Sequence, residues 1–226
     1  YYDPAKTKPA TILKRLRGNG CPRAKQIAPA TAKDGSLTAT EIDQITSEIL
    51  AYYSNQPPVT VPDQFAPDPD FPTVAFPNPE EPGALDAAMD LAATVAADAV
   101  LAVDPDADRC AVALPTSRGL RMLTGDELGV LLGWWILERD RRRGLVTAGT
   151  FASSFVSSRL LAKVAAEASV PHVETLTGFK WIARVPDLRY GYEEALGYCT
   201  APWSVGDKDG ITAALLLPVL LMRQGE

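Results

Sequence analysis

From residue 97 onward, short apolar runs alternate with segments whose apolar residues recur at helical spacing, and this alternation constrains the fold more than any other feature. Alternation of this kind is typical of α/β domains, in which helices cover a largely parallel sheet. We therefore predict an α/β fold with mixed, largely parallel sheet layers and flanking helices. A strand covered on both faces is expected within 98–105, two short strands within 110–125, and further strands within 145–151 and 171–176. Helices are expected within 125–144, 157–169 and 211–222.

A proline-rich tract precedes this regular part of the chain. Most of the 19 prolines lie between Pro57 and Pro105. Proline fixes φ and lacks a backbone donor, which excludes it from helix interiors and central strands, so we interpret the tract as an extended connection. Amphipathic patterns predict one helix before it, at 38–53, and another at 84–99.

Charge and composition exclude several classes of function. The net charge of −6 argues against nucleic acid as a partner, although the first 33 residues are basic. The longest apolar stretch, 211–222, contains Pro218 and is too short to span a bilayer, so no membrane partner is expected. The three cysteines form no CxxC pair, and the first ten residues lack a signal-peptide core. A cytoplasmic protein with reduced thiols is the expectation.

Three aspartates at alternate positions, Asp104, Asp106 and Asp108, follow the apolar run VLAV, and Arg109 comes next. Carboxylates this close repel one another unless a cation compensates, and three oxygen ligands on one loop suit Mg²⁺. An EF-hand is excluded, because its glycine and glutamate positions hold Arg109 and Pro115. A haloacid-dehalogenase-type phosphatase and a solvated acidic turn remain alternatives.

The aspartate loop resembles the metal loop of the α-D-phosphohexomutase superfamily, the phosphoglucomutases and phosphomannomutases, which carry DxDxDR at the end of a strand. Further stretches follow in the family's order. They are TLTGFKWI (175–182), GYEEALGY (191–198), which is similar to the sugar-recognition loop, and DKDGITAALLL (207–217). The segment before the metal loop, 66–86, also resembles the family, so the resemblance covers 66–226.

The resemblance implies a mutase that interconverts hexose 1-phosphate and hexose 6-phosphate, of glucose or mannose, through a bisphosphate intermediate. It implies Mg²⁺ as cofactor, glucose 1,6-bisphosphate as activator and a sugar phosphate as substrate. The implied residues are Asp104, Asp106 and Asp108 for the metal, Arg109 and Lys180 for catalysis, and Thr177, Gly178, Phe179, Lys180, Glu193, Glu194 and Lys208 for substrate. The implied domains are a remnant of the first (1–53), a shortened second with the proline-rich connection (54–96), and the third, of phosphohexomutase type (97–226), with the fourth absent.

The sequence also departs from the family's pattern. Ala195 stands where the sugar loop often has serine, and the segment that carries the phosphoserine is missing, with Ile12 at the corresponding position. We favour part of a longer enzyme over a shortened homologue, because the metal and sugar loops are both intact. A non-catalytic, metal-dependent sugar-phosphate-binding protein is the alternative. His172, the sole histidine, is expected to be structural.

Overall fold

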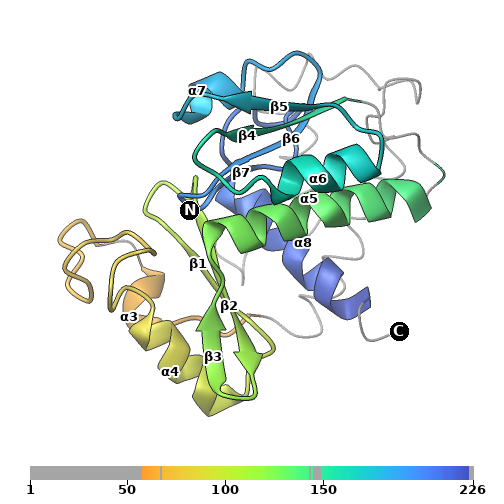
Figure 1. Ribbon diagram of the computed structural model, residues 1–226. Coiled ribbons are helices and arrows are strands. Elements are labelled where there is room, and N and C mark those ends of the chain that lie inside the picture. The colour runs from red at the N-terminus through yellow and green to blue at the C-terminus, as the bar shows by residue number, and fades with distance from the viewer. Residues whose placement is uncertain (1–57, 67, 143, 145–148, 224–226) are drawn as a thin grey trace, which may run out of the picture. The chain divides into compact units, whose positions relative to one another are not determined.

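The computed structural model describes residues 58–66, 68–142, 144 and 149–223, without the side chains of 218–223 (Figure 1). The chain divides into two compact units, Tyr1–Pro58 and Val59–Glu226, and all described residues except Pro58 belong to the second. The predicted helix at 38–53 and the basic segment at 1–33 lie outside the described residues.

The first sheet has three strands in the order β1-β2-β3, and both pairings are antiparallel. The strands are β1 (Val100–Val103), β2 (Cys110–Thr116) and β3 (Gly119–Met122). Helix α4 (Asp86–Val95) packs against this sheet, where Ala92 meets Val100 and Ala113. The two short strands expected within 110–125 are confirmed. We expected the strand at 98–105 to be covered on both faces, but β1 ends at a half-exposed residue, Val103.

The second sheet has four strands in the order β5-β4-β6-β7. Its strands are β4 (Thr150–Ser154), β5 (His172–Thr175), β6 (Leu188–Glu193) and β7 (Gly197–Cys199). Strand β4 runs parallel to β5 and β6, whereas β7 pairs antiparallel with β6. The predicted mixed α/β class is therefore confirmed, with the parallel pairs confined to this sheet.

Helices cover both faces of the second sheet. Successive side chains of each strand point to opposite faces, so neighbouring residues pack against different helices. Phe151 and Tyr190 belong to the main core with α5 (Gly125–Arg142) and α6 (Leu160–Glu167), which lie side by side in Figure 1. On the other face, Ala152 packs with α7 (Phe179–Ile182). Helix α8 (Gly210–Arg223) contacts α5, β2 and β7, which ties the two sheets together.

Helix α5 begins and packs as its sequence dictates. The Thr124 hydroxyl accepts a hydrogen bond from the Glu127 N–H at 3.1 Å, and the Glu127 carboxylate accepts one from the Thr124 N–H at 2.9 Å, which is a capping box. Further along, Gly129 lets the Tyr192 ring approach the helix backbone, since a Cβ there would lie 2.2 Å from a ring carbon. The Tyr190 hydroxyl donates to the Gly129 carbonyl at 2.6 Å.

The proline-rich tract is not wholly extended, which corrects our expectation. It contains a short helix, α3 (Pro62–Phe65), which begins with a proline. Proline is tolerated at that position because the first N–H of a helix has no partner within the helix. The tract also reaches the site described below, through Asn78. Within the described residues, no helix combines the length and apolar character needed to cross a bilayer.

Candidate functional site

The three predicted metal ligands lie together on the loop between β1 and β2. Each of Asp104, Asp106 and Asp108 offers one carboxylate oxygen, and these three oxygens lie within 4.8 Å of one another. Neighbouring ligands of one octahedral Mg²⁺ lie about 3.0 Å apart and opposite ligands about 4.2 Å apart, so the three oxygens need to draw together by at most about 1.8 Å to bind one ion. The donor set is all oxygen and anionic, which is what hard divalent cations prefer. These residues fit a hard divalent cation such as Mg²⁺.

Arg109 holds the buried member of this cluster. Its backbone N–H donates to Asp104 Oδ1 at 3.0 Å and its Nε donates to Asp104 Oδ2 at 2.6 Å. Burial alone would raise the pKa of Asp104, which is 5% exposed, but the hydrogen bonds and positive charge of Arg109 outweigh it and hold that pKa below its ordinary value. Asp104 is therefore ionised at neutral pH and ready to bind a cation.

Lys208 connects the aspartate loop to a second predicted segment. Its Nζ forms an ion pair with Asp108 and lies 5.6 Å from the centre of the Phe179 ring. The backbone around it is closely packed, since a Cβ on Gly197 would lie 2.5 Å from the Lys208 side chain. With Arg109 and Lys208 included, the cluster carries one net negative charge, and a bound divalent ion would make it positive, which would favour an anionic ligand.

The aspartate loop and the predicted sugar loop are neighbours through their backbones. Arg109 forms a β-bridge with Gly197, and the Cys110 N–H donates to the Leu196 carbonyl at 3.2 Å. These contacts join the start of β2, in the first sheet, to the turn between β6 and β7, in the second. The carboxylates of the metal loop and the paired glutamates are therefore brought to one region of the molecule.

The two paired glutamates make different contacts. Glu193 Oε1 accepts a hydrogen bond from the Gly178 N–H at 2.6 Å, which links the sugar loop to the segment before α7. Glu194 Oε2 instead accepts hydrogen bonds from the hydroxyls of Ser154 and Ser157, at 3.0 and 2.8 Å. We expected both glutamates to face a sugar, but the structure commits one Glu194 oxygen to the serines.

The structure connects most of the predicted residues but not all of them. The contacts above join the aspartates, Arg109, Lys208, Phe179, Gly178 and the two glutamates. Thr177 and Lys180 are exposed, and neither takes part in these contacts. Lys180 Nζ lies 5.6 Å from the Trp181 ring centre.

Sequence reasoning missed three residues at this site. Ser154 and Ser157 lie at and just after the end of β4, and the serine-rich run SSFVSS directly behind a predicted strand was the available signal. Asn78 lies in the proline-rich tract, and its side-chain oxygen accepts a hydrogen bond from Arg109 Nη1 at 3.2 Å. No pattern in the sequence pointed to Asn78.

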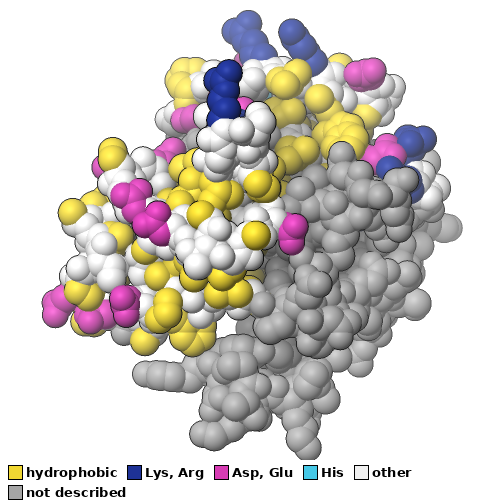
Figure 2. All heavy atoms as spheres, turned by 90° about the horizontal axis from the view of Figure 1, so that it is seen from below, with side chains coloured by type: hydrophobic (Ala, Val, Ile, Leu, Met, Phe, Trp, Pro, Cys, Tyr) yellow, Lys and Arg dark blue, Asp and Glu magenta, His cyan; other side chains and the backbone are white. Residues whose placement is uncertain are grey.

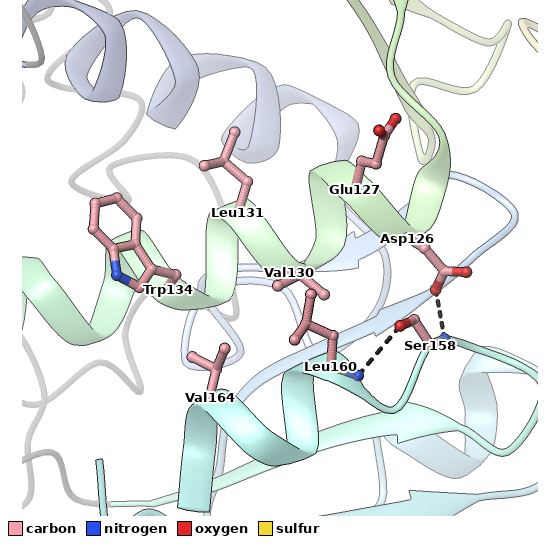
Figure 3. A pocket seen from close by; sticks show the side chains of 8 residues that line it. All are labelled: Asp126, Glu127, Val130, Leu131, Trp134, Ser158, Leu160 and Val164. Carbon is pink, nitrogen blue, oxygen red and sulfur yellow. Dashed lines mark hydrogen bonds between the residues drawn. The ribbon is translucent and has the colours of Figure 1, made fainter. Parts of the chain in front are cut away.

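An apolar groove lies elsewhere, between α5 and α6 (Figure 3). It is lined by Asp126, Glu127, Val130, Leu131, Trp134, Ser158, Leu160 and Val164. None of the predicted site residues is among them, so the groove is separate from the candidate site. Figure 2 shows one face of the molecule, where apolar patches lie among groups of both charges.

The comparisons with known proteins agree with this arrangement. One family model, "Phosphoglucomutase/phosphomannomutase, alpha/beta/alpha domain II", matches residues 41–118, and the model for domain III of the same family matches 124–226. The aspartate loop thus falls in the domain II match, whereas we predicted from the sequence that it belongs to the third domain. The glutamates and Lys208 fall in the domain III match. The domain boundaries themselves stay a prediction.

Several named relatives match over most of this chain. A Haemophilus influenzae protein named "Probable phosphomannomutase" is 46% identical over 187 residues, which cover 81% of this chain and 38% of that protein. Human phosphopentomutase is 44% identical over 174 residues, 71% of this chain and 28% of that enzyme. The chain thus spans less than two fifths of the length of these relatives.

Solved structures show the same fold. The phosphoglucomutase parafusin from Paramecium matches with a TM-score of 0.50 at 26% identity, over 66% of this chain and 26% of that one. A family protein from Burkholderia thailandensis matches with a TM-score of 0.54 at 20% identity, over 66% and 31%. Two models of one family match consecutive parts of the chain, and the matched parts contain the aspartate loop and the paired glutamates. This chain therefore belongs to the phosphoglucomutase/phosphomannomutase family of the α-D-phosphohexomutase superfamily.

Proposed function

We propose that this chain supplies the metal-binding and sugar-recognising parts of a phosphohexomutase, which interconverts hexose 1-phosphate and hexose 6-phosphate through a bisphosphate intermediate. The observation that carries the proposal is the position of Lys208. Its ion pair with Asp108 and its approach to the Phe179 ring join the aspartate loop to the segment beside the paired glutamates. A phosphoryl group held at the metal and a sugar held at the glutamates would then be neighbours.

In this proposal Asp104, Asp106 and Asp108 hold Mg²⁺, and the ion, when bound, stabilises the negative charge of the phosphoryl group in transit. Arg109 keeps Asp104 ionised and in place through two hydrogen bonds. Lys208 keeps Asp108 from repelling its neighbours, and as a cation it also attracts a phosphate. Arg109 is thus a residue that positions a ligand of the metal, as well as a nearby positive charge.

The sugar side of the proposal rests on Glu193, Thr177 and Lys180. Glu193 is half-buried on β6, where a carboxylate can accept hydrogen bonds from sugar hydroxyls. Thr177 directly precedes Gly178, whose N–H donates to Glu193, and Lys180 lies two residues after it. The side chains of Thr177 and Lys180 are exposed to an arriving ligand. Lys180 then offers a point charge to the phosphate that is not being transferred.

The phosphoserine of the reaction is not assigned to any described serine at this site. Ser154 and Ser157 are 1% and 7% exposed and donate to Glu194, so neither is placed to accept a phosphoryl group. We propose that the phosphoserine belongs to a longer enzyme, since this chain spans less than two fifths of its named relatives. A sugar-phosphate-binding protein without turnover is the alternative.

A haloacid-dehalogenase-type phosphatase is not favoured. In that chemistry an aspartate itself attacks the phosphate. The family models that match this chain, at 41–118 and 124–226, are instead those of phosphoglucomutase/phosphomannomutase domains. A pentose 1-phosphate is the second substrate class worth testing, because human phosphopentomutase is 44% identical over the 174 residues that match.

The test is an activity assay on the complete protein with Mg²⁺ and glucose 1,6-bisphosphate, in which glucose, mannose and ribose 1-phosphates are compared. We expect conversion of a hexose 1-phosphate to its 6-phosphate, lost in Asp106→Asn and kept in Asp98→Asn, a control in an exposed aspartate of the loop before β1. Mass spectrometry of the protein should show a gain of one phosphoryl group. Binding of these sugar phosphates without turnover would favour the alternative, and no binding at all would contradict both.

A further inference from the structure

The glutamate pair of the sugar loop is held from behind by two serines. The Ser154 and Ser157 hydroxyls lie 2.8 Å apart, both donate to Glu194 Oε2, and Ser157 Oγ accepts from the Glu194 N–H at 3.2 Å. Both serines are buried. The Glu194 side chain is half-buried, and the two buried hydroxyls fix it in place, because breaking either bond would deprive a buried hydroxyl of its carboxylate partner.

The same loops are also anchored to the start of α5. Asp126 Oδ1 accepts hydrogen bonds from the Ser158 N–H at 2.6 Å and from the Tyr192 hydroxyl at 2.8 Å. At Gly125 the backbone of Glu194 comes so close that a Cβ would lie 1.7 Å from the Glu194 carbonyl oxygen. The loop after β4 and the loop after β6 are therefore fixed against one helix end, and the Glu194 side chain also ties them to each other.

We infer that Ser154, Ser157 and Glu194 are positioning residues, which fix the sugar loop so that Glu193 meets the sugar. The inference rests on the proposed function for the identity of the ligand, which is a sugar. The hydrogen bonds that anchor the loop do not depend on that function. Glu193 accepts one backbone N–H, from Gly178, whose neighbour Phe179 is the residue that Lys208 approaches while it pairs with Asp108. A recognition group works only when supporting hydrogen bonds hold it to within about half an ångström. The adjacent glutamates thus have different tasks.

The experiment compares variants of the complete protein by two measurements. Calorimetry gives the affinity for glucose 1,6-bisphosphate in Mg²⁺, and hydrogen exchange gives the protection of the amides at 191–198. The variants are Ser154→Ala/Ser157→Ala, Glu194→Ala, Glu194→Gln and the triple variant with both serines and Glu194 as alanine. Ser153→Ala is the matched control, because Ser153 is a buried serine of the same strand whose hydroxyl lies 3.1 Å from His172 Nε2 instead.

We expect the serine double variant and Glu194→Ala each to weaken binding by about tenfold and to exchange faster at 191–198. The triple variant should lose no more than either, since all three residues act through one contact. Glu194→Gln keeps an oxygen that accepts both hydroxyls, so it should stay within about threefold of the natural protein. Ser153→Ala should leave both measurements unchanged.

Three results would overturn the inference. Glu194→Gln binding as weakly as Glu194→Ala would mean that the Glu194 charge itself meets the sugar. Additive losses in the triple variant would mean that the serines and Glu194 act separately. Unchanged hydrogen exchange at 191–198 in the serine double variant would mean that the two serines do not fix the sugar loop. If the natural protein binds no sugar phosphate, the proposed function fails, and the exchange measurement alone decides whether the serines hold the loop.

Discussion

At the scale of single residues, His172 should make the free energy of unfolding depend on pH below about 6.5. It is the sole histidine in the sequence, half-buried on β5 with Nε2 3.1 Å from the Ser153 hydroxyl. Burial lowers the pKa of His172 below 6.5, and the negative charge of Glu174 offsets this only in part. The unfolded chain therefore binds a proton more readily than the folded one.

The free energy of unfolding should consequently fall as the pH drops below about 6.5, by at most about 1.4 kcal/mol per pH unit. Above that pH the contribution is fully present, because His172 is neutral in both states. Urea titrations at pH 7.5, 6.5, 5.5 and 5.0 measure the slope, and His172→Gln should remove it. An equal slope in that variant would assign the effect to the carboxylates instead.

Two described cysteines should be chemically inert in the folded protein. Cys110 and Cys199 are buried free thiols, and burial raises the pKa of each to about 12. Because the thiolate is the reactive form, alkylation at pH 7 should leave both unmodified in the folded protein and modify both in urea. Peptide mapping by mass spectrometry measures this, and rapid modification in the folded state would contradict the burial.

At the scale of elements, α8 supports the metal loop through its first residue. The Gly210 N–H donates to the Ala107 carbonyl at 3.0 Å, and a Cβ on Gly210 would lie 2.3 Å from the Arg109 carbonyl oxygen. Gly210→Ala should therefore displace the loop. We expect a stability loss of about 1–3 kcal/mol in urea titrations and a weaker Mg²⁺ affinity by calorimetry.

The matched control is Gly206→Ala, where the nearest atom to a Cβ, the Pro202 carbonyl oxygen, is 4.0 Å away. This variant should keep both the stability and the Mg²⁺ affinity. If Gly210→Ala behaves as Gly206→Ala does, then α8 does not hold the aspartate loop in the way that its contacts indicate.

Some elements could be predicted from the sequence, whereas the pairing of strands and the contacts between distant segments could not. Helix α5 was predicted within a few residues, because its apolar spacing, its first-turn acids and its last-turn cations all agree. The antiparallel partner of β1 was not predicted, since an apolar run does not encode which strand it pairs with. The hydrogen bonds from Ser154 and Ser157 to Glu194 cross about 40 residues of sequence, and only the docking of β4 beside β6 brings them together.

At the scale of the whole described unit, the candidate site lies where the two sheets meet. The aspartate loop ends at β2, in the antiparallel sheet, and Glu193 is the last residue of β6, in the mixed sheet, with Glu194 directly after it. One continuous core runs from Cys110 in the first sheet to Tyr190 in the second. Folding of that core is therefore what assembles the site, and a ligand that binds the assembled site should stabilise the core in return.

Magnesium should accordingly raise the thermal stability of the protein through Asp106. At a concentration 100 times the dissociation constant, a cation that binds only the folded state contributes about 2.7 kcal/mol to the free energy of unfolding, or a rise in Tm of about 5–10 °C for a protein of this size.

Asp106 is exposed, and its carboxylate supplies one of the three oxygens of the cluster. Asp106→Asn should keep the Tm without metal, because it disturbs no core contact, and should lose most of the rise with Mg²⁺. Asp98→Asn, an exposed aspartate outside the cluster, should keep the full rise in scanning calorimetry. Equal shifts in both variants would mean that Mg²⁺ acts by general screening of charge, and the aspartate cluster would then not be the metal site.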